Sequence, residues 1–199
     1  MFEASVPLTP KGGGGICITA DALNKADILL STTDAATSHV IRAGTASVVS
    51  HAKLYIGHND VIEAIGEGVV RRSLAAAMAH DTLTVAYRNP RMTQLHADRI
   101  VDFVTKQVGH PYSTKGAARA PTALCRFIST GEGFFCSQLV VEAYMRAGIP
   151  LTKMPSTCIT PGGLVEIAEK DFQYVGHLKG ELTHFPILGA ADAQEPAYG

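Results

Sequence analysis

The fold expected for this chain is decided by two stretches, Ser-His-Ala-Lys-Leu-Tyr-Ile-Gly at residues 50–57 and Phe-Phe-Cys-Ser-Gln-Leu-Val at residues 134–140. The first has the alternating pattern of a strand, with His51 at its start. The second opens an amphipathic helix with Cys136 in its first turn. A thiol and an imidazole carried on two regular elements are the minimum equipment for cysteine-nucleophile chemistry. The two stretches therefore predict a cysteine paired with a histidine that precedes it in the chain.

Further strands and helices are expected around these stretches. Turn residues at 58–60 predict a hairpin between the strand at 51–57 and a strand at 61–65. Other apolar runs predict strands at 27–31, 69–72, 82–88 and 172–178, and helical periodicity predicts helices at 36–46, 93–108, 136–147 and 164–170. Successive strands with helices before and after them favour an α+β fold with an antiparallel sheet, rather than a doubly wound one.

The folded body is expected to be a single domain over residues 16–188. A chain of 199 residues is long enough to bury a substantial core. Pro7, Pro10 and the glycines at 12–15 do not suit a regular element, so residues 1–15 are predicted to form a flexible N-terminal tail. Residues 189–199 are predicted to form a flexible C-terminal tail for the same reason.

Composition and charge exclude several classes of function. The formal net charge of −1 implies no large attraction to nucleic acid or to an anionic membrane. The pair Arg71-Arg72 is expected to be solvated charge at a strand end. The chain has no run of 18 apolar residues, so no transmembrane segment is predicted. The N-terminus lacks the pattern of a secretory signal. Synthesis in the cytoplasm without a signal peptide is therefore expected.

The four cysteines do not form a metal-binding pattern. Cys17, Cys125, Cys136 and Cys158 make no CxxC pair, and the chain has no HExxH motif, so neither a metal nor a cofactor is predicted. Cytoplasmic synthesis favours free thiols over disulfides. Taken singly, each cysteine is most simply a small buried residue.

The chemistry expected of Cys136 depends on its thiolate, which is scarce at neutral pH unless its pKa is lowered. The start of a helix offers partial positive charge and unpaired backbone N–H groups. An imidazolium at His51 would add a full positive charge. The same N–H groups are suited to hold the oxyanion of a tetrahedral intermediate.

Glu63 is the candidate to orient His51, because the predicted hairpin brings residue 63 or 65 near residue 51. Its apolar neighbours make a carboxylate unusual at this position, although a side chain that simply points to solvent explains it as well. Ser38-His39 is a weaker rival because it has no acid in register. His58 is expected to be solvated in a turn.

Six segments in order resemble the circularly permuted branch of the papain-like NlpC/P60 superfamily, the YiiX/YebB-like amidases. They are residues 26–30, 50–57, 61–69, 109–112, 135–140 and 160–164, which include Ser-His, Gly-x-Pro-Tyr and Phe-Cys-Ser-Gln-Leu-Val motifs. Permutation explains why the histidine comes before the cysteine. The chain departs from the family pattern at Ala26, Gln138 and Ser113, where Gly, Glu and Asp are usual.

The resemblance implies a papain-like half-barrel of antiparallel strands packed against helices. It implies Cys136 as nucleophile, His51 as general base and acid, and Glu63 as the orienting residue, with Tyr112 and Ser137 as substrate-binding residues. The implied reaction is hydrolysis of an amide bond in a peptidoglycan peptide. Without a signal peptide, such an enzyme fits an antibacterial effector exported by a type VI machine, with an immunity protein or a secretion component as partner.

Two other readings remain open at this stage. Permuted relatives that handle lipids make an acyltransferase or thioesterase an alternative, which a long apolar groove beside Cys136 would favour. A non-catalytic binding module on the same scaffold is the second alternative. It would be favoured if His51 and Cys136 lay too far apart to interact, or if Glu63 pointed away from the imidazole.

Overall fold

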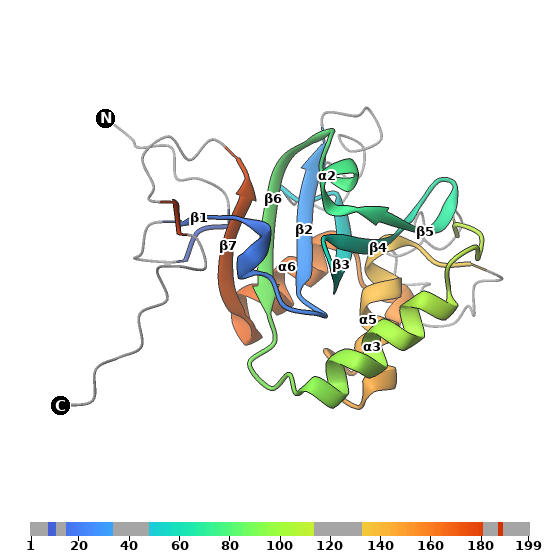
Figure 1. The fold of residues 1–199 in the computed structure, drawn as a ribbon. Helices are drawn as coiled ribbons and strands as arrows, with labels where there is room; N and C mark the ends of the chain where they lie inside the picture. Colours follow the sequence, from blue (N-terminus) through green and yellow to red (C-terminus); the bar gives the residue numbers. More distant parts are fainter. Residues whose placement is uncertain (1–7, 11–14, 34–47, 114–132, 181–186, 189–199) are drawn as a thin grey trace.

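An eight-stranded sheet forms the body of the molecule in the computed structural model, which describes residues 8–10, 15–33, 48–113, 133–180 and 187–188 (Figure 1). Its strands lie in the order β5-β4-β3-β2-β6-β7-β1-β8. Their bounds are β1 Cys17–Ile18, β2 Ile28–Thr33, β3 His51–Gly57, β4 Asp60–Ile65, β5 Gly68–Ser73, β6 Asp81–Arg88, β7 Gln173–Lys179 and β8 Ile187–Leu188.

The sheet is antiparallel from β5 through β7, and among the described strands the parallel pairs are those of the short strand β1 with β7 and with β8. Strand β3 lies between β2 and β4, so the residues at its start are held from both sides. His58 and Asn59 join β3 to β4 with φ values of 55° and 58°, the left-handed pair that a tight two-residue hairpin turn requires. The α+β fold with an antiparallel sheet is confirmed.

The described helices are α2 Leu74–Ala77, α3 Gln94–Lys106, α5 Cys136–Ala147 and α6 Pro161–Asp171, with 3-10 turns at η1 Ala20–Ala22 and η3 Ser156–Cys158. The three longer helices, α3, α5 and α6, begin and end close to where the sequence predicts. The side chains of Thr93 and Thr160 cap α3 and α6 by accepting N–H bonds from residues three positions later. Gly148, with φ of 92°, ends α5 in the left-handed conformation that favours glycine.

Helices α3, α5 and α6 cover one face of the sheet and bury its larger apolar core. Leu54 and Ile62 from the strands pack there with Ile100, Leu139 and Leu164 from the three helices. The opposite face has a smaller cluster around Leu29, Tyr55 and Val61, covered in part by α2. Both faces of the central strands are therefore buried, which takes Lys53 out of solvent as well.

Several expectations about the remaining residues need correction. Leu8, within the predicted tail, is buried in the larger core, and its carbonyl accepts a hydrogen bond from Tyr87 Oη. Cys158 is disulfide-bonded, so the expectation of free thiols fails there, while Cys17 and Cys136 are free. The predicted helix at 36–46 lies outside the described residues. The short elements β1, β8 and α2 were not predicted, because so few residues carry no detectable periodicity.

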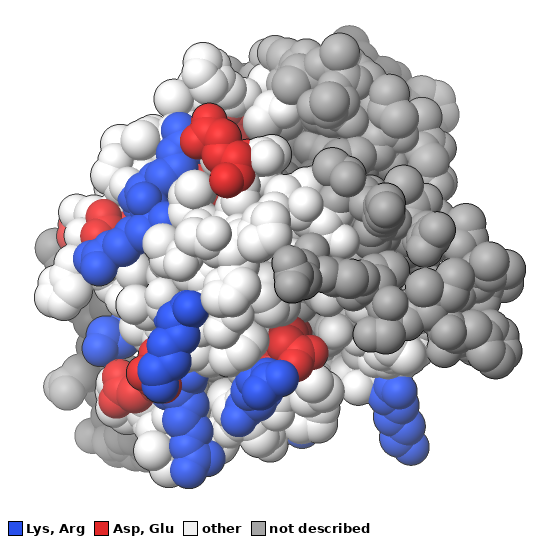
Figure 2. Space-filling model, turned by 90° about the vertical axis from the view of Figure 1, so that its right-hand side faces the viewer, with Lys and Arg blue, Asp and Glu red and all other residues white. Residues whose placement is uncertain are grey.

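The charged surface shows no strongly basic or acidic face in the view of Figure 2, where basic and acidic side chains are intermixed over the described residues. Opposite charges are also paired along two helices, Lys106 with Asp102 on α3 and Arg146 with Glu142 on α5. Among the described helices, none is long and apolar enough to cross a membrane.

Candidate active site

Cys136 is the first residue of α5, and the start of this helix faces the start of β3. The N-cap residue Phe135 provides no side-chain hydrogen bond to the first turn, so the turn keeps backbone N–H groups for another partner. The sulfur receives backbone hydrogen bonds from Ala52 of β3 and from Ser137. Cys136 is thus placed where a negative charge on sulfur is stabilised.

His51 lies between Cys136 and Glu63. Its Nε2 is 2.6 Å from Glu63 Oε2, and its ring is also hydrogen-bonded to the Cys136 thiol. Because Nε2 faces the carboxylate, Nδ1 is the nitrogen left for the sulfur. The strand register pairs Lys53 with Glu63, so His51 reaches Glu63 diagonally, from two residues earlier on the same face of β3.

The electrostatics of the pair favour a thiolate and an imidazolium. Burial alone would raise the pKa of the Cys136 thiol, but the charge and hydrogen bond of His51, together with the two backbone N–H groups, lower it. Burial alone would lower the pKa of His51, but Cys136 and then Glu63 raise it to about 9. Between these two pKa values the proton resides on His51, and the sulfur is negatively charged.

Glu63 is held from its other side by Arg72, a residue that the sequence placed in solvent. Arg72 Nη1 donates to Glu63 Oε1 at 3.4 Å, and its Nη2 donates to the carbonyl of Ala76 at 3.4 Å. Burial would raise the pKa of Glu63, but the hydrogen bond and charge of His51, with the charges of Lys53 and Arg72, hold it below its usual range. Each carboxylate oxygen of Glu63 therefore has a cationic partner. Val70 pairs with Glu63 across the two strands, and Arg72 follows it by two residues, so the two-residue period of a strand puts Arg72 on the same face as Glu63. That period is the sequence signal that could have indicated the contact.

Tyr112 lies near Cys136, in a segment that two glycines hold in place. The Cys136 thiolate is close enough to raise the pKa of Tyr112, in addition to the effect of burial. A Cβ at Gly133 would lie 2.3 Å from the Pro111 carbonyl oxygen, and one at Gly68 would lie 2.6 Å from that of His110. Both glycines have positive φ, so the backbone approach that positions Tyr112 requires glycine on both sides.

The other predicted candidates do not join this cluster. The Ser137 side chain is fully buried and donates its hydroxyl hydrogen to the Ile159 carbonyl at 2.6 Å, so its assignment as a substrate-binding side chain is corrected. Only its backbone N–H faces the sulfur. His58 lies in the turn at the opposite end of β3 from His51. The rival Ser38-His39 lies outside the described residues.

Comparison with known proteins assigns the family. A family described as a permuted papain-like amidase enzyme (YaeF/YiiX, C92) matches residues 22–158. This chain belongs to the permuted papain-like amidase family. Among its relatives in that family, the probable lipoprotein peptidase YaeF of Escherichia coli (strain K12) is 32% identical over 200 residues, which cover 81% of this chain and 73% of that protein. The chain is an enzyme of the papain-like cysteine peptidase or amidase kind.

A solved structure supports the permuted amidase fold. The crystal structure described as the metalloprotein yiiX from Escherichia coli O157:H7 aligns with a TM-score of 0.51 and 18% identity, covering 79% of this chain and 89% of that one. At this identity the likeness concerns the fold alone. Within the described part of this permuted amidase, no group of three or more His, Cys, Asp or Glu side chains is arranged to hold a metal ion.

Proposed function

We propose that this enzyme hydrolyses an amide bond in a peptidoglycan peptide, with Cys136 as nucleophile, His51 as general acid and base, and Glu63 as the residue that orients His51. One observation carries the catalytic part of the proposal. The His51 ring is hydrogen-bonded to the Cys136 thiol on one side and to the Glu63 carboxylate on the other. Nucleophile, base and orienting group in this sequence are the arrangement that covalent acyl transfer requires.

The proposed reaction has two halves. The Cys136 thiolate attacks the amide carbonyl, and the resulting oxyanion is stabilised by free backbone N–H groups in the first turn of α5. His51 gives its proton to the leaving amine as the C–N bond breaks, which leaves a thioester on Cys136. Neutral His51 then takes a proton from water as the water attacks the thioester. A carboxylic acid product leaves, and the thiolate and imidazolium are restored.

The choice of a cell-wall peptide rests on the family assignment and on analogy with the NlpC/P60 superfamily. The family is one of amidases, and the YaeF relative is named as a peptidase. The sequence motifs resemble those of the NlpC/P60 superfamily, which makes a peptide with a D-amino acid or a γ-linked bond the leading substrate. A non-catalytic binding module is disfavoured, because His51 contacts Cys136 and Glu63 points to the imidazole.

Digestion of purified peptidoglycan tests this proposal. Wild type, Cys136→Ala and Cys17→Ala are incubated with the polymer, and soluble products are identified by mass spectrometry. Cys17 is the matched control because it is the other cysteine shown to be free. New muropeptides are expected from wild type and Cys17→Ala but not from Cys136→Ala, and the masses identify the cleaved bond.

An unchanged digest from all three proteins would contradict the cell-wall substrate. The same proteins are then assayed with a long-chain acyl thioester, which is the substrate that the acyltransferase or thioesterase alternative requires. Release of thiol by wild type but not by Cys136→Ala, in the absence of muropeptides, would replace the proposed substrate class while retaining the nucleophile.

Action on peptidoglycan also requires the enzyme to reach the periplasm, which we propose occurs by a signal-independent route such as type VI secretion, with an immunity protein protecting the producer. Expression in a bacterial host, with and without an appended export signal, tests whether the enzyme acts in the periplasm. Lysis is expected only for exported wild type and not for exported Cys136→Ala. Equal growth of all four strains would contradict a periplasmic site of action.

A further inference from the structure

Ser31 of β2 lies beside His51, the proposed general base, on the same face of the sheet. The strand register pairs Ser31 with His51 of β3 on one side and with Thr84 of β6 on the other. Directly opposed residues of antiparallel strands point to the same face, with their Cβ atoms about 4.5–5.5 Å apart. The hydroxyl of Ser31 is therefore an immediate neighbour of the imidazole that the proposed reaction uses.

Ser31 Oγ is a buried polar atom without a hydrogen bond. The residue is 0% exposed, and its Oγ has no partner among the described residues. His96 Nδ1 and Gln138 Oε1 are in the same condition, but both of those side chains are only half-buried. A buried hydroxyl without a partner lowers stability, and alanine, which has nearly the same shape, would avoid that loss. Stability therefore does not explain the hydroxyl.

Packing explains why the side chain at position 31 is small. The register partners of Lys53 and Asp81 on β2 are residues 29 and 33, and Ser31 lies midway between them on the same face. The ion pair of Lys53 and Asp81 thus crosses β2 over Ser31, where a larger side chain would displace it. Alanine would leave the same room, so packing does not explain the hydroxyl either.

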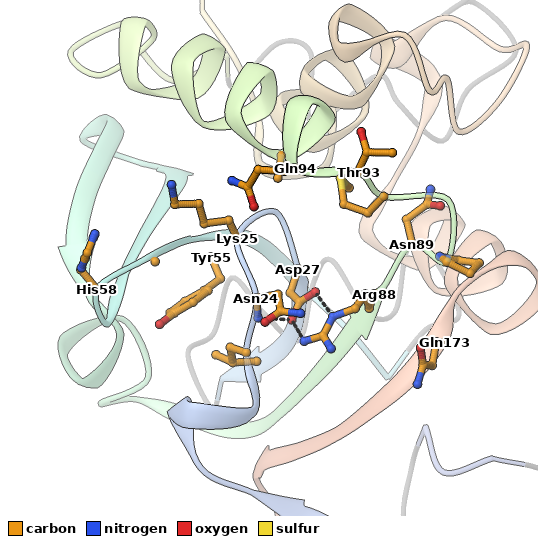
Figure 3. Close-up of a pocket in the computed structure, with 15 residues that line it drawn as sticks. Asn24, Lys25, Asp27, Tyr55, His58, Arg88, Asn89, Thr93, Gln94 and Gln173 are labelled. Carbon is orange, nitrogen blue, oxygen red and sulfur yellow. Dashed lines mark hydrogen bonds and ion pairs between the residues drawn. The ribbon is translucent and has the colours of Figure 1, made fainter. Parts of the chain in front are cut away.

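The pocket at the other end of β3 offers no comparable group among the described residues. It has a volume of about 680 Å³ and is lined by the ends of β3 and β6 and the start of α3. Its charged side chains are already paired, Arg88 with Asp27, as Figure 3 shows, and Lys25 with Asp98. None of the buried atoms without partners named above belongs to its lining. An unpartnered buried hydroxyl therefore distinguishes the His51 end of the strand.

The charged groups around His51 leave a place for this hydroxyl. They are Cys136 on α5, Glu63 on β4 with Arg72 behind it, and Lys53 on β3 with its partner Asp81 at the start of β6. Glu63 and Cys136 occupy the two nitrogens of the His51 ring, so the remaining ring edge has no polar contact from either of them. Since no other bond holds the hydroxyl of Ser31, it is free to turn its oxygen toward the ring.

We propose that Ser31 is a positioning residue whose hydroxyl oxygen supports the protonated ring of His51. This rests on the proposed roles of Cys136 and His51, but not on the choice of substrate. The oxygen is the negative end of the hydroxyl dipole, so it stabilises an imidazolium more strongly in a buried site than in water. When His51 gives up its proton, the hydroxyl turns without breaking a bond. A small loss of stability is thereby exchanged for a better proton donor.

The titration of His51 tests the proposal without any substrate. Wild type and Ser31→Ala are labelled with ¹³C-histidine for nuclear magnetic resonance, and the His51 signal is identified by its absence from His51→Gln. The pKa of His51 in wild type is expected at about 9. In Ser31→Ala this pKa should be lower by about 0.5–1 unit, the equivalent of one hydrogen bond. For the same reason kcat/KM for amide hydrolysis should fall about 3- to 10-fold.

Thr32→Val is the matched control. Thr32 follows Ser31 on β2 and points to the other face of the sheet, where its hydroxyl donates to the Val48 carbonyl. Loss of that bond should lower the free energy of unfolding and leave the pKa of His51 unchanged. Ser31→Ala should do the reverse, with a free energy of unfolding equal to or above that of wild type in urea denaturation.

The outcomes separate this proposal from the proposed function. Equal pKa values of His51 in wild type and Ser31→Ala, both well above the ordinary value of about 6.5, would overturn the role of Ser31 alone. A wild-type pKa at the ordinary value would overturn both the role of Ser31 and the pairing of His51 with Cys136. A loss of stability in Ser31→Ala with no change in the pKa of His51 would show that the hydroxyl serves folding.

Discussion

His51 and Lys53 stand two residues apart on the same face of β3, and both have cationic side chains paired with carboxylates, yet their surroundings differ. Lys53 is 1% exposed, and its Nζ is bonded to Asp81 and to the Ala77 carbonyl. Asp81 also accepts from Thr84 Oγ1 at 2.7 Å. His51 keeps 17% of its side chain exposed and is shared between Glu63 and a thiol.

The difference separates a structural ion pair from a reactive one. The pair of Lys53 and Asp81 is buried, so neither charge can contact a reactant. Around His51 the proton has two acceptors of different strength and an opening to solvent, so it is able to move. A charged pair on a strand is therefore reactive when one partner has a second, ionisable neighbour and room for a substrate. The predictions below test this contrast, beginning with the largest effect.

Replacing His51 should abolish activity with a limited loss of stability. His51→Gln removes the proton donor and the charge that lowers the pKa of Cys136, so kcat/KM should fall by about 10³-fold or more. Glu63 keeps Arg72 as a partner, so the free energy of unfolding should fall less than for a change at Lys53. Amide hydrolysis and chemical denaturation measure the two effects. Substantial activity in His51→Gln would contradict the assigned role.

Replacing Lys53 should mainly lower the stability of the protein rather than its catalytic rate. Lys53→Met leaves Asp81 buried without its cation, which should cost about 3–5 kcal/mol in the free energy of unfolding. Lys106→Met is the control, because its exposed pair with Asp102 should contribute well under about 1 kcal/mol. Urea denaturation compares the two variants. Similar stabilities for Lys53→Met and wild type would contradict a closed structural pair.

Neutralising Glu63 should slow catalysis while the protein stays folded. Glu63→Gln retains a hydrogen-bond acceptor for His51 but removes the charge that helps to raise its pKa from the ordinary value. We expect kcat to fall about 10²-fold, and the basic limb of the pH–rate profile to move from about 9 to lower pH. Glu67→Gln, in the exposed turn between β4 and β5, is the control. An unchanged basic limb would exclude electrostatic support from Glu63.

Removing Arg72 should have the smallest effect. Arg72→Gln frees one oxygen of Glu63, so kcat should fall a few-fold through looser positioning of His51, with KM unchanged. The basic limb should move to higher pH if it moves, because a positive charge near the imidazolium is lost. Arg71→Gln is the matched control, since Arg71 is bonded to Asp60 and points to the other face. Equal effects of the two substitutions would rule out a role for Arg72.

The sequence predicted the elements that carry strong local patterns. Helix α5 begins at Cys136 and ends at Ala147 as its periodicity indicates, because Gly148 supplies the left-handed residue that stops it. The hairpin of β3 and β4 follows from its turn residues. These two elements place Cys136, His51 and Glu63, so this cluster of candidate residues could be predicted from the sequence.

What the sequence did not reveal depends on long-range pairing. The burial of Lys53 requires α2 and Asp81, which lie at least 20 positions later in the chain, so no pattern within β3 itself indicates it. The contact of Arg72 with Glu63 depends on the register between β4 and β5. Ala26 shows a local conflict: its φ of 69° is a conformation that favours glycine, the residue usual at this position in the related family.

The most direct test of the ion pair is the pH dependence of Cys136 alkylation by iodoacetamide, followed peptide by peptide by mass spectrometry so that Cys17 is measured separately. The account predicts that Cys136 in wild type reacts with a midpoint below the ordinary thiol pKa of about 8.5, and that a second inflection appears near pH 9 as His51 loses its proton. In His51→Gln the midpoint should move upward. A wild-type midpoint at the ordinary value, unchanged in His51→Gln, would contradict the thiolate–imidazolium pair.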